Sequence, residues 1–374
     1  MRGALTGIAW VGGLLMAVPL AAQTNGVAVR LTGRMQFQFN TTSVSEVDVD
    51  PGQSISISGT TFETRRVRLA AHLDINGWIT GMIEPDFALA KLQIRQAWMN
   101  LAIDPAFELR MGQFKKPFSL IMLTSSLETP MIERGLRIRD LEEAYRAADE
   151  AAVSPLLGSF RGTTLLGEEQ ELLEQFGYMN YEMGVSAHGR LGEVEYDVGL
   201  FNGTGADRRD DNDGKSYVGR VRWHAPTTVP LQIGAAASYH EVLVSTSAPI
   251  VDGSAFEVDV ELGEFRRAGA HVLAEAVLGD NLLVDERFRG AQGVLSFFRP
   301  VTGGRVDGIE PLARLSWGDP DRQVPGDEGL LLTPGINLYF QGRNRLQFNW
   351  DVFVPSGDRF ETKYALRAQA QLAF

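Results

Sequence analysis

Basic side chains recur at matching positions in several segments of this chain. Arg30 and Arg34 lie four residues apart, and Arg66 and Arg68 lie two apart, so each pair shares one face of an extended segment. Fixed cations on one face attract anions and raise their local concentration. Arginine suits phosphate because its planar fork can bind two oxygen atoms. The spacing therefore predicts a surface that guides anions.

The candidate anion-guiding residues share the polar face of their segments or begin the loop that follows one. They are Arg34, Arg66, Arg68, Arg95, Arg110, Lys115, Lys116, Arg220 and Arg222. The alternative is that these cations pair with carboxylates of the same face, such as Glu108, Glu310 and Asp351, and only brace the wall. The position of a residue in an alternating segment predicts which face its charge lies on, but not which residue it pairs with. Both interpretations therefore stay open.

The segments that carry these residues alternate polar and apolar side chains, as β-strands do. Alternation alone also fits a soluble sheet with one wet face. A membrane barrel is favoured because the segments have about 9–13 residues, which suits a tilted strand that crosses a bilayer. Aromatic residues such as Trp223, Trp317 and Trp350 lie toward segment ends, as in the girdles of barrels. The polar face is rich in arginine and glutamine, which suits a water-filled lumen.

The connections between segments alternate between short and long. This rhythm predicts an all-β fold: a transmembrane antiparallel β-barrel of about sixteen strands, with short periplasmic turns and long extracellular loops. Residues 41–60 are expected to form one outward loop. Both ends of the barrel are expected in the periplasm, and the chain ends on Phe374, which resembles the outer-membrane assembly signal.

Residues 115–174 form the longest segment without alternation, and residues 139–152 within it look helical and acidic. Loops of this length are usually functional or disordered. A sixteen-stranded barrel has a lumen wide enough for water. We therefore expect this partly helical loop to fold into the lumen and constrict the pore. The alternative is an outward loop that shields the rim.

The first residues read as a secretory signal peptide. Residues 1–22 combine Arg2, an apolar run and the small pair Ala21 and Ala22. We expect cleavage after Ala22, which leaves residues 23–374 as an outer-membrane β-barrel. No later stretch approaches the length of a spanning helix.

Composition excludes several classes of function. The 374 residues include no cysteine, so disulfides and cysteine nucleophiles are ruled out. The net charge of −12 argues against a nucleic-acid partner. The acidic cluster at 207–213 lacks the frame of a calcium-binding loop, and the sequence predicts no metal and no cofactor.

An enzyme is not expected. A barrel hydrolase needs a histidine with serine or a carboxylate near the outer rim. Three of the five histidines, His72, His188 and His224, fall toward periplasmic ends. His240 lies near the outer rim, but the adjacent Glu241 faces the other way. A different alternative is a structural or adhesive barrel that conducts nothing.

Several motifs resemble the phosphate-selective porin O and P family. They include FETRRVRLA at 62–70, LRMGQFKKPFSLIMLT at 109–124 with MIER at 131–134, and GIEPLARLSWGD at 308–319. The resemblance spans nearly the whole mature chain. It implies a trimeric, sixteen-stranded outer-membrane porin in which arginines and lysines of the lumen wall and loop guide anions.

Together these features predict passive diffusion of small anionic solutes, such as phosphate, or neutral ones through a water-filled barrel. The expected partners are outer-membrane lipid and two further copies of the chain in a homotrimer.

Overall fold

The computed structural model describes residues 21–24, 26–50, 53–88, 92–139, 169–206, 210, 213–243, 250–282, 286–356 and 362–374. Sixteen strands make up the barrel: β2 (Val27–Asp50), β3 (Gln53–Ile75), β4 (Ile79–Asp86), β5 (Gln93–Asp104), β6 (Phe107–Lys115), β9 (Tyr181–Leu191), β10 (Val194–Phe201), β11 (Ser216–Ala225), β12 (Leu231–Leu243), β13 (Ile250–Leu262), β14 (Gly269–Asn281), β15 (Glu286–Pro300), β16 (Gly308–Asp319), β17 (Gly329–Tyr339), β18 (Arg345–Pro355) and β19 (Lys363–Ala373). A short strand β1 (Ala21–Thr24) pairs with the start of β2.

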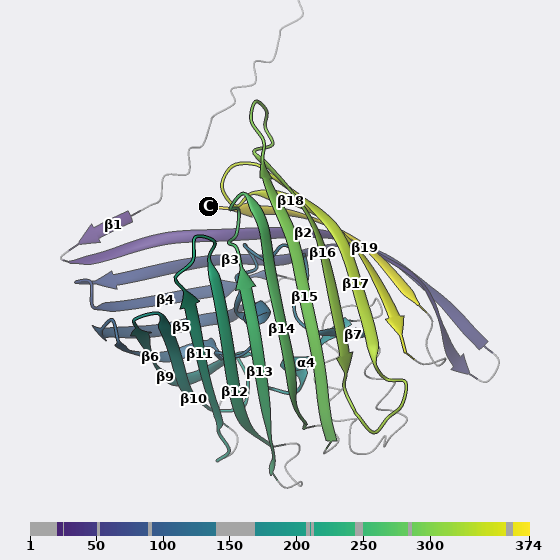
Figure 1. The fold of residues 1–374 in the computed structure, drawn as a ribbon, viewed down its shortest axis with the longest axis horizontal. Coiled ribbons are helices and arrows are strands. Elements are labelled where there is room, and N and C mark those ends of the chain that lie inside the picture. Colours follow the sequence, from purple (N-terminus) through teal and green to yellow (C-terminus); the bar gives the residue numbers. More distant parts are fainter. Residues whose placement is uncertain are drawn as a thin grey trace, which may run out of the picture.

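Each barrel strand runs antiparallel to its neighbours, and the last strand closes the ring on the first (Figure 1). β19 pairs with β2 from Ala365 opposite Thr42 to Ala373 opposite Arg34. β6 pairs with β9, so the long connection between them leaves the ring and returns beside its starting strand. The predicted sixteen-stranded antiparallel barrel is confirmed.

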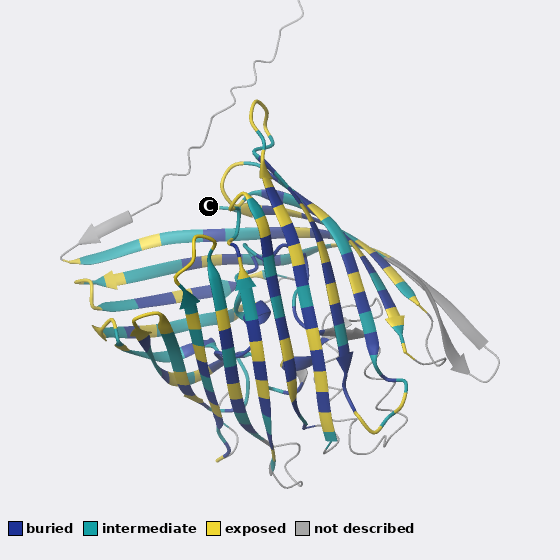
Figure 2. Ribbon diagram, viewed as in Figure 1, coloured by how far each residue is buried: buried dark blue, intermediate teal, exposed yellow. Residues whose placement is uncertain are grey.

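The burial of side chains along each strand is inverted relative to a soluble protein. Leu315 and Trp317 belong to the outward face of β16, and Leu315 is 52% exposed, whereas the neighbouring Arg314 is 1% exposed. The same alternation bands every strand from β12 to β18 (Figure 2). An outward apolar face and an inward polar face are what lipid outside and water inside require.

The first hairpin differs from its expectation. The sequence predicts an outward loop over residues 41–60, but β2 continues to Asp50 and β3 begins at Gln53. Residues 44–50 and 54–58 alternate valine or isoleucine with small or acidic residues, which favours strands. Pro51 and Gly52, between the strands, are turn-forming residue types.

Some expectations lie outside the described residues. These are the signal peptide over 1–20, the acidic helix over 140–152 and most of the acidic cluster at 207–213. Within the part of the chain that the structure describes, no helix is long and apolar enough to cross a membrane.

Candidate functional site

The chain that follows β6 lies against the inner wall of the barrel. Its helix α1 (Leu120–Leu123) contacts β14, and the short strand β7 (Arg137–Arg139) contacts β16 and β17. Phe118 and Ile121 are fully buried. Figure 1 draws β7 and the second short helix α4 (Leu172–Gln175) behind strands β13–β17. The described part of the 115–174 loop is therefore enclosed by strands.

Two buried carboxylates of the wall hold the start of α1. The backbone N–H of Leu120 donates to Glu257 (3.0 Å), and that of Ile121 donates to Glu275 (3.1 Å). Ser119, the N-cap residue, donates its hydroxyl to both carboxylate oxygens of Glu275 at 2.9 Å. The first N–H groups of a helix have no partner within the helix, so these acids satisfy them.

Side chains from the far end of the sequence hold the next part of the loop. Asn337 donates to the Pro130 carbonyl (2.8 Å), and Arg314 donates to the Glu133 carbonyl (2.9 Å). The Asn349 side-chain oxygen accepts from the Ile132 N–H (2.8 Å). The wall from β13 to β18 is thus occupied by the loop, and its polar residues serve the loop backbone.

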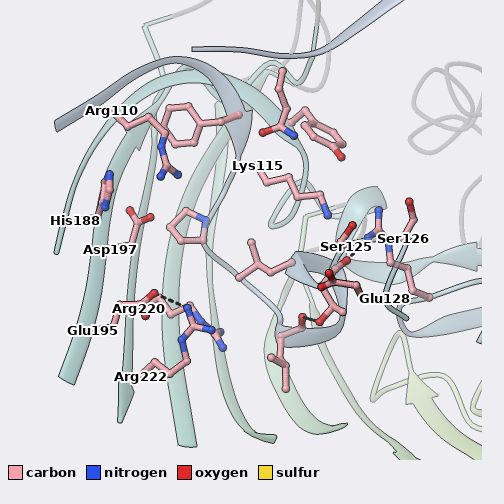
Figure 3. A pocket seen from close by; sticks show the side chains of 18 of the residues that line it. Arg110, Lys115, Ser125, Ser126, Glu128, His188, Glu195, Asp197, Arg220 and Arg222 are labelled. Carbon is pink, nitrogen blue, oxygen red and sulfur yellow. Dashed lines mark hydrogen bonds and ion pairs between the residues drawn. The ribbon is translucent and has the colours of Figure 1, made fainter. Parts of the chain in front are cut away.

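The opposite side of the lumen is open. A cavity of about 580 Å³ lies between the loop and the wall formed by β2–β6 and β9–β11 (Figure 3). Six of the nine candidate residues line it: Arg34, Arg68, Arg110, Lys115, Arg220 and Arg222. A second cavity of about 340 Å³ shares Arg34, Arg68 and Glu84 with the first and extends to Phe374 at the end of β19.

Most of the arginines that line the larger cavity are paired with carboxylates. Arg34 and Arg68 share Glu84. Arg68 also donates to Asp86 at 2.8 Å. These pairs place the two cations side by side and neutralise much of their charge.

The same pairing holds at the next strands. Arg220 donates to Glu257 (2.7 Å) and Asp259 (2.6 Å), and Arg222 donates to Glu195 at 2.5 Å. Glu257 therefore bridges a wall arginine and the loop helix. At these positions the geometry matches the bracing alternative.

Arg110 and Lys115 differ from the other cavity cations. Among the described residues, no carboxylate forms an ion pair with either of them. Arg110 lies over the rings of Trp98 (5.1 Å) and Phe114 (5.5 Å). Lys115 lies over the ring of Tyr181 (5.5 Å) and donates to the Met122 carbonyl. The faces of these rings attract the two cations but carry no net negative charge.

Three candidate residues lie outside the larger cavity's lining. Arg66 lies 3.6 Å from the loop carboxylate Glu133, and Lys116 pairs with Glu182 at 2.8 Å while only 1% exposed. Arg95 lies 3.6 Å from Asp86, which also takes Arg68. The structure therefore brings six of the nine candidates together and places the other three in ion pairs around them.

A family model matches residues 29–264, more than half of the chain. The chain belongs to the phosphate-selective porin O and P family. A search of curated proteins found no match. The family and the barrel together make this an outer-membrane porin and point to a channel rather than an enzyme.

Solved structures share the fold at low identity. An anion-selective porin from Comamonas acidovorans is 13% identical with a TM-score of 0.58, covering 93% of this chain and 100% of that one. The outer membrane channel DcaP of Acinetobacter baumannii is 11% identical with a TM-score of 0.58, over 94% and 99%. OprB of Pseudomonas putida is 10% identical with a TM-score of 0.58, over 93% and 94%.

Arg134 is a cavity residue of this porin that sequence reasoning did not single out. It comes from the loop, lines the cavity and donates to the Thr124 carbonyl. Burial and the nearby Arg68 guanidinium lower its pKa below the ordinary value for arginine. Its place in the MIER motif could have marked Arg134 as a candidate. The alternation of strand residues could not, because Arg134 lies in a loop.

Proposed function

We propose that this porin lets small solutes cross the outer membrane by passive diffusion, with a preference for anions such as phosphate. The observation that carries the proposal is the charge of the larger cavity. Among the described residues, seven cationic side chains and five acidic ones line it. Arg110 and Lys115 contribute to this excess, and neither forms an ion pair with a carboxylate among the described residues. Fixed positive charge in a narrow passage with low-dielectric walls concentrates anions.

The 115–174 loop is the proposed constriction. Its described part contacts the β13–β18 wall and leaves the cavity on the other side as the passage. Deleting much of residues 135–171 should raise single-channel conductance. An unchanged conductance would assign that part of the loop to the rim.

We further propose that residues 1–22 are a cleaved signal peptide and that the porin forms a homotrimer. Mass spectrometry of protein from outer membranes should find a chain beginning at Gln23. Electrophoresis without heating should show a complex of three chains.

The function is tested by the reversal potential of the refolded protein in a planar bilayer under a potassium chloride gradient, followed by addition of phosphate. Anion preference with block by phosphate supports the proposal in full. Weak or cationic selectivity without block removes the anion preference. No channels from a folded, heat-modifiable barrel would favour a structural barrel.

A further inference from the structure

The aromatic surroundings of the two unpaired cations suggest a more specific ligand than an inorganic ion. Arg110 projects from β6 between Trp98 of β5 and Phe114 of its own strand. Lys115, the last residue of β6, lies over Tyr181 of β9, whose hydroxyl accepts from Arg68 at 3.3 Å. The two cavity cations that form no ion pair with a carboxylate therefore lie against aromatic rings.

Part of the lining of the same cavity is apolar. Pro117, Leu120 and Leu123 of the loop contribute to this lining. Figure 3 shows Arg110 and Lys115 above the cavity, with Lys115 extending toward the loop residues Ser125 and Ser126. At about 580 Å³ the cavity lies in the range that holds a small organic molecule.

We propose that Arg110, Lys115, Phe114 and Tyr181 form a binding site for organic anions in which a carboxylate is attached to a flat apolar body. The inference rests on the proposed porin function and names the solute class for its passage. The carboxylate meets the edge of the Arg110 guanidinium. The apolar body lies between the rings and the side chains of Leu120 and Leu123.

The site favours an organic anion because both the guanidinium of Arg110 and the ring of an aromatic carboxylate are weakly hydrated. A guanidinium is weakly hydrated and stacks on aromatic faces, and its planar N–H edge can bind a carboxylate. Its Nε has no hydrogen-bond partner in the described structure. Inorganic phosphate gains charge attraction here but has no surface to place against the apolar side chains. An aromatic carboxylate gains both, because burial of its ring removes apolar surface from water.

Asp197 of β10 limits the affinity. It lines the same cavity on the side of Arg110, and its charge acts on that guanidinium more than any other carboxylate does. One of its carboxylate oxygens has no hydrogen-bond partner among the described residues. It repels a bound carboxylate, so binding is weak enough for the solute to leave, which conduction requires.

The test compares four anions as blockers of the potassium chloride current through the full-length porin in a planar bilayer: benzoate, cyclohexanecarboxylate, acetate and inorganic phosphate. Benzoate should block at the lowest concentration, followed by cyclohexanecarboxylate. Arg110→Gln should raise the half-blocking concentration of benzoate about tenfold, the effect of losing one hydrogen-bonded charge. Asp197→Asn should lower it. Phe114→Leu should weaken benzoate more than acetate.

The matched control is Arg30→Gln, which removes one charge from the smaller cavity, where Arg30 lies on the lining. It should leave the ratio of benzoate to acetate block unchanged. Heat-modifiable migration on a gel checks that each variant folds. Equal block by benzoate and acetate in an anion-selective channel would overturn the organic-anion site and leave the proposed function intact. A channel without anion preference in potassium chloride alone would remove the anion preference from the proposed function.

Discussion

The two sides of the lumen use charged residues in different ways. Along β13, β14 and β16–β18 the wall's polar side chains bond to the loop backbone, as Glu275 does at Ile121 and Asn337 at Pro130. Along β2–β6 and β9–β11 they face an open cavity, where most arginines pair with neighbouring acids and two cations, Arg110 and Lys115, do not. The same alternating pattern in the sequence therefore serves two purposes, support of the loop and contact with solutes.

Removal of the loop from its wall should have the largest effect on the difference between the two sides of the lumen. Replacing residues 118–134 with a short glycine–serine linker should raise single-channel conductance severalfold, because the space beside β13–β18 joins the cavity. Single-channel recording measures the step size. An unchanged step in a folded variant would mean that the loop does not narrow the passage.

A single wall residue should loosen the loop without removing it. Glu275→Ala deprives Ser119 and Ile121 of their acceptor, and each buried group left unsatisfied costs about 1–3 kcal/mol. The open channel should become noisier and close at lower voltage. The control is Glu261→Gln, because Glu261 also lies on the wall and lines the cavity but bonds to His271 rather than to the loop. Equal noise in both variants would contradict the anchoring role.

One acid on each side of the lumen can be neutralised to compare how strongly each side affects ion selectivity. Glu84→Gln frees Arg34 and Arg68 from a shared carboxylate and should increase anion preference. Glu310→Gln removes the same charge from the wall near the loop, where Glu310 bonds to Asn337 and Tyr339, and should change it less. The reversal potential under a potassium chloride gradient measures both, and equal shifts would show that position in the lumen does not matter.

The smallest expected effect concerns the connection between β16 and β17. Burial, with the nearby charges of Asp319 and Asp321, raises the pKa of Asp327 to about 7. The Asp327 carboxyl therefore holds its proton more tightly in the folded connection than in the unfolded chain. The stability of the folded connection is greatest below about pH 4 and falls as the pH rises to 7. Hydrogen exchange of residues 320–328, after correction for the intrinsic rates, should therefore be slower at pH 5 than at pH 8.

Asp327→Asn is the control for that dependence, because an amide does not titrate in this range. The difference in exchange between pH 5 and pH 8, corrected for intrinsic rates, should shrink in this variant. If it persists, another group controls the stability of the connection.

Much of the fold could be predicted because alternate side chains of a barrel strand face lipid and the lumen, so apolar and polar residues alternate in the sequence. Arg66 and Arg68 follow this rule, and so do Leu315 and Trp317 on the lipid side. The rule also misplaced residues 41–60, where polar residues alternate with valine and isoleucine beyond the expected rim. The polar residues of this segment predicted a loop, but the pairing of β2 with β3 continues through most of it.

The candidate site could be predicted only in part. The alternation of residues indicated which arginines face inward. It did not indicate that Arg220 pairs with Glu257, which lies two strands away in the sheet. The loop's place depends on contacts such as Asn349 with Ile132, which join residues 217 positions apart. Such contacts leave no local pattern, and the aromatic neighbours of Arg110 read equally well as packing residues.

The central claim is that the two unpaired cations, rather than the paired arginines, give the passage its anion preference. It is tested most directly by the reversal potential of two double variants under the same potassium chloride gradient. Arg110→Gln with Lys115→Gln removes the unpaired charges, and the account predicts that most of the anion preference disappears. Arg222→Gln with Glu195→Gln removes one complete ion pair, and the reversal potential should stay close to that of the unmodified porin. Retained anion preference in the first variant, or its loss in the second, would contradict the account.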